Sequence, residues 1–242
     1  MAEPPSGCHH SSDVQEFPAQ EQNGSRRIGR GVFLATVAGG LSSLYWGKAA
    51  WGHVSHALHG VGEVLGPGSG WRIYTVAATM PTFDPAAWTL RVGGLVEHPL
   101  ELSYDDLRRL PQASQVTDFH CVTGWTVNGV RWRGVRFKDL LARARPHPQA
   151  HALEFVSAEQ PYVDYLTLRQ ARLRDVMLAW EMDGKPLARE HGAPVRVVIP
   201  EMYGYKNVKW VAEINLVPQP ATGYWENLGY DRNAWVGRSN GY

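Results

Sequence analysis

The chain has 242 residues, of which 44% are hydrophobic and 19% charged, a balance typical of a folded protein with one sizeable core. Lys and Arg number 24 against 23 Asp and Glu, so no strong net field favours nucleic acid or anionic lipid as a partner. The only two cysteines, Cys8 and Cys121, stand in very different sequence settings and exclude a disulfide framework. The 10 Trp and 10 Tyr suit a body with aromatic-lined clefts.

The N-terminal part has the composition of a polar tail followed by an export signal. Residues 1–24 are rich in Ser, Pro, Gln and Glu and predict a disordered tail. Residues 25–50 begin with the pair Arg26-Arg27 and continue as an uncharged, Gly- and Ser-diluted apolar stretch over 31–47. This pattern is typical of a secretion signal of the twin-arginine type, which exports folded proteins, and the alternative is a retained membrane anchor. We expect export across the cytoplasmic membrane to the periplasm or another extracytoplasmic compartment.

A Gly-rich segment over 51–70 reads as a linker, and the folded body is expected over 71–242. His53, His56 and His59 lie in the linker at a spacing of one helical face. Because no Cys or acidic residue completes a first set of ligands there, a solvated face is the simpler interpretation.

The body combines short strand patterns with short helix patterns. Ser103 and Asp106 have the spacing of a capping box and predict a short helix through Leu110. Residues 136–145 predict another helix, and Asp183-Gly184 predicts a hairpin turn. Strands are predicted over 88–92, 116–122, 152–157, 176–180, 195–199 and 208–217. This mixture predicts an α+β fold that is mixed and β-rich, and the usual nucleotide, zinc-protease and c-type haem motifs are absent from the sequence.

Cys121 is the candidate reactive residue, and its sequence setting leaves three interpretations open. It is a buried inert thiol, a catalytic thiolate activated by a histidine, or a soft thiolate ligand to a transition metal. His120 is badly placed as a base, because adjacent strand residues point to opposite faces. The metal interpretation explains the lack of a His, Cys or carboxylate cluster if the other ligands come from a cofactor.

Four segments occur in order along the body: DFHCVTGW over 118–125, VRWRGV over 130–135, HGAPVR over 191–196 and YGYKNVKW over 203–210. Together they resemble the molybdopterin-binding domain of the sulfite oxidase superfamily, in particular its exported bacterial branch that includes the catalytic subunit of the periplasmic methionine sulfoxide reductase. The resemblance covers residues 71–235 and implies a mixed α+β domain with a β-rich core.

The resemblance also implies the cofactor and its contacts. The cofactor is molybdenum held by molybdopterin, with Cys121 as the thiolate ligand of the metal and the pterin dithiolene supplying further sulfur ligands. Arg196 suits bidentate capture of the cofactor phosphate. The implied cofactor-binding residues are Tyr74, Thr75, Cys121, Ser157, His191, Arg196, Asn207, Val208 and Lys209.

Two departures from the family patterns bear on the substrate. The sulfite-oxidising branch has an arginine pair soon after its cysteine, where this chain has Val-Thr-Gly-Trp over 122–125. The methionine-sulfoxide branch has asparagines where this chain has His191 and Trp71-Arg72. We expect an exported molybdenum oxidoreductase that transfers an oxygen atom to or from a small sulfoxide, N-oxide or sulfite-like compound. The alternative is a non-catalytic molybdopterin-binding or structural protein, and a cysteine hydrolase lacks its usual motifs.

The expected partners follow from the same reading. Besides the small-molecule substrate, a separate electron-transfer partner is expected, such as a membrane cytochrome, because the sequence has no haem motif. Nucleic acid is not expected as a partner, and a monomer is expected. Trp125, Arg131, Trp132 and Arg133 are the predicted lining of the pocket or of a partner-docking surface.

Overall fold

The computed structural model describes residues 64–65 and 70–240. The predicted tail, the signal segment and His53, His56 and His59 lie outside the described residues. Inside the predicted linker, Val64–Leu65 (β1) pairs antiparallel with Arg72–Ile73 (β2), so this end of the linker has regular structure. None of the described helices has the length and apolar character to cross a membrane.

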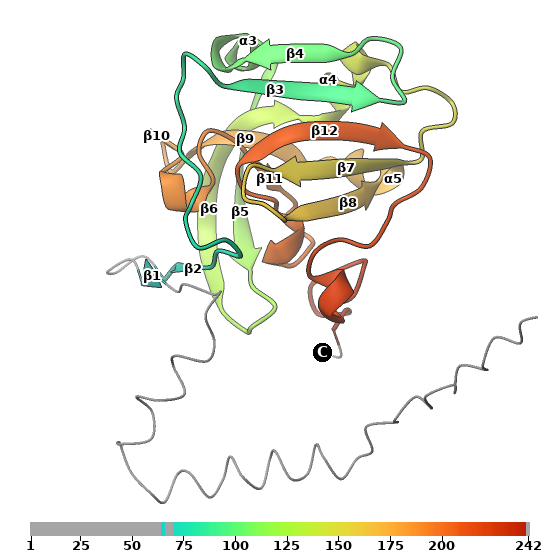
Figure 1. Cartoon of the computed structure of the whole chain (residues 1–242). Helices are drawn as coiled ribbons and strands as arrows, with labels where there is room; N and C mark the ends of the chain where they lie inside the picture. Colours follow the sequence, from blue (N-terminus) through green and yellow to red (C-terminus); the bar gives the residue numbers. More distant parts are fainter. Residues whose placement is uncertain (1–63, 66–69, 241–242) are drawn as a thin grey trace, which may run out of the picture. The chain divides into compact units, whose positions relative to one another are not determined.

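A five-stranded sheet has the order β4-β3-β12-β7-β8 (Figure 1). Strand β12 pairs parallel with β3, and all other neighbours pair antiparallel. Buried side chains alternate with exposed ones along most of β3 and with half-buried ones along β8, as expected for strands with one face on the core. The strands are Leu100–Ser103 (β4), Thr89–Gly94 (β3), Val211–Val217 (β12), Ala152–Ser157 (β7) and Val163–Thr167 (β8).

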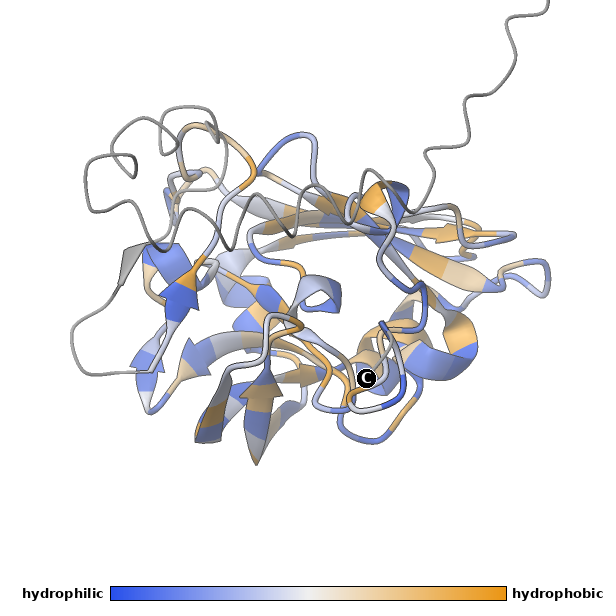
Figure 2. Cartoon of the chain, turned by 90° about the horizontal axis from the view of Figure 1, so that it is seen from below, coloured by the Kyte–Doolittle hydropathy of each residue, from blue (hydrophilic) through white to orange (hydrophobic). Residues whose placement is uncertain are grey.

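A second five-stranded sheet has the order β10-β9-β6-β5, with β11 also paired to β9. The predicted turn at Asp183-Gly184 joins β9 to β10, and both residues have positive φ, at 51° and 78°. Figure 2 shows polar and apolar segments alternating along several strands. The strands are Lys185–Pro186 (β10), Met177–Met182 (β9), Thr126–Arg136 (β6), Gln112–His120 (β5) and Arg196–Val198 (β11).

The helices are short. The predicted capping box forms at Ser103 and Asp106 and begins α3, Tyr104–Arg108. The predicted helix over 136–145 is α4, Phe137–Ala144, which buries Leu140 and Leu141. The remaining helical segments are α5 (Leu168–Ala171) and the 3-10 turns η1 (Arg189–His191), η2 (Gly204–Lys206) and η3 (Glu226–Leu228). The predicted β-rich α+β fold is confirmed.

Candidate active site

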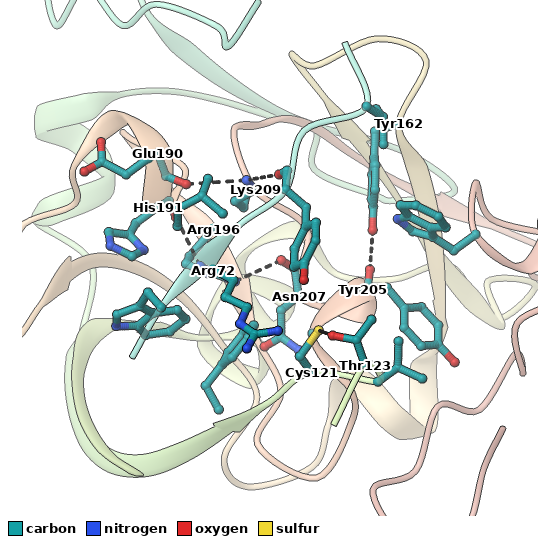
Figure 3. Close-up of a pocket in the computed structure, with 18 of the residues that line it drawn as sticks. Arg72, Cys121, Thr123, Tyr162, Glu190, His191, Arg196, Tyr205, Asn207 and Lys209 are labelled. Atoms are coloured by element: carbon teal, nitrogen blue, oxygen red, sulfur yellow. Dashed lines mark hydrogen bonds between the residues drawn. The ribbon is translucent and has the colours of Figure 1, made fainter. Parts of the chain in front are cut away.

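A cavity of about 370 Å³ opens where the ends of several strands and their loops meet (Figure 3). Its wall comes from β2, the turn after β5, the end of β7, η1, β11, η2 and the segment after β12. Seven predicted site residues line it: Tyr74, Cys121, Ser157, His191, Arg196, Asn207 and Lys209. The fold therefore gathers residues that are far apart in the sequence around the one cysteine among the described residues.

Cys121 lies in a tight turn rather than in the predicted strand. Strand β5 ends at His120, and the Cys121 amide donates to the Trp125 carbonyl at 2.9 Å. The thiol is partly exposed, and its Sγ lies 3.2 Å from the Thr123 hydroxyl. His120 is directed elsewhere, with Nδ1 at 3.0 Å from the Thr126 hydroxyl. The turn thus presents the thiol to the cavity without a histidine partner from its own strand.

Arg196, on β11, is a buried cation. Its guanidinium donates to the main-chain carbonyls of His191 and Asn207, both at 3.2 Å. It also lies over the rings of Phe119 and Trp132, at 5.2 and 5.3 Å from their centroids. Burial lowers the pKa of Arg196 to about 10, so it remains charged at neutral pH.

Lys209 is a half-buried amine on the same cavity wall. Its Nζ donates to the Tyr74 carbonyl at 2.7 Å and to the Glu190 carbonyl at 3.4 Å. Burial, and then the charge of Arg196, lower the pKa of Lys209 to about 7. A bound anion would raise this pKa again, because opposite charge favours the protonated amine.

His191 lies at the end of η1 with its ring edge-on to Trp71, at 4.9 Å between centroids. Burial, and then the Arg196 charge, lower the pKa of His191 to about 4, so its imidazole is neutral at pH 7. Within the described part of the chain, its buried Nδ1 has no hydrogen-bond partner.

Ser157 and Asn207 hold the cavity wall together through their side chains. The Ser157 hydroxyl donates to the Lys209 carbonyl at 2.8 Å and accepts from the Glu159 amide at 3.0 Å. The Asn207 side-chain oxygen accepts from the Ile199 amide at 2.7 Å. Both side chains are therefore engaged with the main chain, and their first effect is to fix the segment that carries Lys209 and the end of strand β11, which carries Arg196.

The structure does not place every predicted residue on the cavity wall. The Thr75 hydroxyl turns to the Ala77 carbonyl at 3.1 Å, and Val208 packs in the main hydrophobic core. Of the predicted pocket or docking residues, Trp125 lines the cavity, whereas Trp132 is buried in the core. Arg131 and Arg133 lie along β6, where Arg133 pairs with Glu181.

Several lining residues were not predicted from the sequence: Arg72, Glu159, Tyr162, Tyr205, Trp225 and Tyr230. Trp225 and Tyr230 lie in the segment after the last strand, which has no periodic pattern. The available signal was the concentration of aromatic residues in this segment, which contains Tyr224, Trp225, Tyr230 and Trp235.

The cavity residues fit a molybdenum-pterin. Cys121 offers a soft thiolate ligand, the type of ligand that suits such a metal. In the described part of the chain, the polar contacts of Arg196 and Lys209 go to main-chain carbonyls, and neither forms a direct ion pair with a carboxylate there, although the charges of Glu159 and Glu190 favour the protonated form of Lys209. A phosphate-bearing ligand would give both side chains a direct anionic partner. No group of three or more His, Cys, Asp or Glu able to hold a metal occurs among the described residues.

Gly192 packs closely against Lys209, in a backbone conformation that favours glycine. Its φ is +101°, and a Cβ at this position would lie 2.8 Å from Lys209 Cβ. We expect Gly192→Ala to cost about 1–3 kcal/mol of stability from backbone strain, together with displacement of Lys209 and weaker cofactor retention. Gly184→Ala is the matched control, because φ is +78° there with nothing within 4 Å. Thermal melts and molybdenum content check this, and equal cofactor retention in the two variants would contradict it.

Comparison with known proteins identifies relatives of the chain. The family described as "Oxidoreductase molybdopterin binding domain" matches residues 77–225. The uncharacterized oxidoreductase YuiH of Bacillus subtilis is 36% identical over 147 residues, which are 61% of this chain and 74% of YuiH. The protein-methionine-sulfoxide reductase catalytic subunit MsrP of Gluconobacter oxydans is 30% identical over 68% of this chain and 58% of MsrP.

A solved structure supports the fold. The sulfane dehydrogenase SoxCD from Paracoccus pantotrophus aligns with a TM-score of 0.56 and 22% identity, over 70% of this chain and 53% of the other. The chain thus spans little more than half the length of MsrP and of the SoxCD chain.

Proposed function

The chain belongs to the oxidoreductase molybdopterin-binding domain family, and from this we propose that it transfers an oxygen atom to or from a small sulfoxide, N-oxide or sulfite-like compound. The family's cofactor is a molybdenum-pterin, as the resemblance had implied. One observation carries the proposal most directly. The Cys121 thiol lines the same cavity as the buried Arg196 guanidinium and the half-buried Lys209 amine.

Reduction of a sulfoxide consumes an electron pair and a pair of protons. The S–O bond breaks, the sulfur is reduced by an electron pair, and the oxygen leaves as water after taking up a pair of protons. When bound, the molybdenum-pterin supplies the exchange of the electron pair and of the oxygen atom. A sulfite-like compound would instead be oxidised. Its sulfur gives up an electron pair and forms an S–O bond with the oxygen of water, which releases a pair of protons.

The chain's own residues hold and position the cofactor. Cys121 binds the metal through its thiolate, and the Thr123 hydroxyl then donates to that sulfur, because a thiolate can only accept. Arg196 and Lys209 bind the anionic part of the pterin cofactor, and Ser157 fixes the Lys209 loop through its carbonyl. Trp71 and Phe119, 4.8 Å apart between centroids, form an apolar part of the cavity wall that limits access of water.

We also propose that the chain exchanges electrons with a separate protein and that it is exported across the cytoplasmic membrane. The paired arginines at 26–27 and the uncharged stretch after them support export. Fractionation of a bacterial host that has the twin-arginine pathway tests this. We expect the chain outside the cytoplasmic membrane, and the Arg26→Lys/Arg27→Lys variant retained in the cytoplasm. Equal distribution of the two proteins would contradict this part of the proposal.

The activity is tested with protein purified from a host that makes molybdopterin. Benzyl viologen reduced by dithionite serves as electron donor, and a sulfoxide or an N-oxide serves as oxidant. We expect oxidation of the viologen with at least one of them, or reduction of ferricyanide with sulfite. A protein that contains molybdenum but is inert in all these assays would instead be a non-catalytic cofactor-binding protein.

A further inference from the structure

An irregular segment that follows β2 forms part of the cavity wall. Tyr74 and Val76 of this segment both line the cavity. Figure 3 shows the chain that carries Arg72 running across the cavity from the side of His191. We call residues 74–81 the entry strap, because the chain crosses the cavity here before it continues to β3.

Side chains rather than a sheet hold the entry strap in place. Among the described residues, the main chain of 74–81 makes no hydrogen bond to the main chain of another segment. Lys209 Nζ donates to the first carbonyl of the strap at 2.7 Å. At the other end, the Arg189 guanidinium donates to the Pro81 carbonyl at 3.0 Å and to the Met80 carbonyl. The position of the strap therefore depends on a few charged side chains of the cavity wall and of η1.

Glu159, in the connection between β7 and β8, holds the middle of the strap. This residue is 3% exposed, and its Oε1 accepts from the amides of Val76 and Ala77 at 2.8 and 3.3 Å. Its own main chain is fixed, because its amide donates to the Ser157 hydroxyl at 3.0 Å and its carbonyl accepts from the Tyr162 amide at 2.8 Å. An anionic acceptor on a fixed support makes strong hydrogen bonds to main-chain amides.

A buried carboxylate is unexpected on the wall of a cavity that takes an anionic cofactor. Like charges repel each other, and burial strengthens the repulsion. In the described part of the chain, the polar contacts of the Glu159 carboxylate are the two strap amides. Its presence is therefore explained by the segment that it holds, and not by attraction to the cofactor.

We propose that Glu159 is a positioning residue that fastens the entry strap across the cavity, and that the fastened strap retains the molybdenum-pterin. Arg189 fastens the returning end of the same strap. This inference rests on the cofactor of the proposed function and not on its substrate. Because Glu159 acts through main-chain amides, an uncharged acceptor of the same shape should replace most of its effect.

The first test compares Glu159→Leu with Glu159→Gln in holoprotein from a host that makes molybdopterin. In Glu159→Leu both strap amides lose their acceptor, so hydrogen exchange in peptides over 74–81 should become roughly 10- to 100-fold faster. Molybdenum should be lost faster on dialysis. Glu159→Gln keeps an oxygen that can accept from both amides and should restore most of the protection and retention. Asp84→Ala is the matched control, because it removes an exposed carboxylate that accepts from the Ala86 amide at 3.0 Å outside the cavity.

The second test approaches the strap from its exposed end, where a substitution should not prevent folding. Arg189→Met removes the donors to Met80 and Pro81 and keeps the Arg189 carbonyl that accepts from the Trp210 indole. We expect faster exchange over 74–81 and faster loss of molybdenum, with a cooperative melt like that of the wild type. Arg91→Met is the matched control, because Arg91 is an exposed arginine of β3 that pairs with a carboxylate outside the cavity.

The outcomes separate the inference from the proposed function. Loss of molybdenum from Glu159→Leu and Glu159→Gln alike, with slow exchange over the strap in both, would show that the charge acts on the cofactor directly and would overturn the inference. Wild-type retention in Glu159→Leu and Arg189→Met would also overturn it. Strap-dependent retention in a holoprotein that is inert with every oxide and with sulfite would overturn oxygen-atom transfer and leave the inference intact.

Discussion

Cys121→Ser is expected to lower the molybdenum content of the purified protein from about one atom per chain to a small fraction, and to abolish turnover. A serine hydroxyl is a harder and much less acidic group than a thiol, so it is a poor replacement for a soft thiolate. In the described part of the chain, Cys121 is the only cysteine, and no cluster of other ligands could take over the metal. Elemental analysis of both proteins from a host that makes molybdopterin measures the effect.

The control separates loss of the ligand from loss of the turn. Thr123→Val removes the hydroxyl that lies 3.2 Å from Cys121 Sγ and keeps the thiol. This variant should retain the metal, and both variants should melt cooperatively, because the turn is closed by main-chain bonds between Cys121, Gly124 and Trp125. Full molybdenum content in Cys121→Ser would exclude the cysteine as the ligand, and Cys121 would then be a structural thiol.

Much of the fold could be predicted because its signals are local. The capping box at Ser103 and the turn at Asp183-Gly184 each depend on residues within a few positions, and both form. Strand β7 has the predicted bounds, Ala152–Ser157, because its apolar run is uninterrupted by glycine.

The strands missed by sequence reasoning have long-range causes. Strand β6 contains Gly129 and Gly134, which read as turn signals. Gly134 is instead required by packing, since a Cβ there would lie 2.1 Å from the Leu178 carbonyl of β9. Strand β8 carries Asp164 at a buried position, which breaks its apolar pattern. The compensating cation, Lys206, is 42 positions away and could not be anticipated from the sequence around β8.

The candidate site was predictable where it coincides with ordered motifs, and not elsewhere. Cys121, His191, Arg196 and Lys209 lie in recognisable segments, and all line the cavity. Tyr205 lies in one of those segments, whereas Trp225 and Tyr230 lie outside them and reach the cavity only because the segment after β12 contributes to its wall. Their role depends on chain topology, which residue spacing does not encode.

Lys206→Met is expected to lower the free energy of unfolding by about 3–5 kcal/mol, the cost of leaving a buried ionic group without its partner. The Lys206 side chain is 3% exposed, and its Nζ donates to Asp164 Oδ1 at 2.7 Å and to Glu226 Oε1. Gly223 packs against both carboxylates, and a Cβ there would lie 2.7 Å from Asp164 Oδ1. Removing the ammonium therefore leaves buried carboxylates with little room for water. Urea unfolding followed by circular dichroism measures the loss.

The stability lost in Lys206→Met should depend on pH, because Asp164 titrates in the folded protein. Burial raises the pKa of Asp164 to about 7, although Lys206 acts in the opposite direction. Because this pKa is above the unfolded value of 3.8, the folded protein binds more protons between the two values. Stability therefore falls as pH rises through that window and levels off above about pH 7. Without Lys206 the pKa rises further, so Lys206→Met should destabilise the protein more at pH 8 than at pH 5.

Asp164→Asn is the matched variant for this cluster. It removes one negative charge, leaves Lys206 paired with Glu226, and keeps an oxygen that can accept from the ammonium. We expect a much smaller loss of stability than in Lys206→Met, and a flatter pH profile than in the wild type, because the titrating carboxyl is gone. Equal losses of stability in both variants, without a difference between pH 5 and pH 8, would show that packing rather than charge holds the segment after β12.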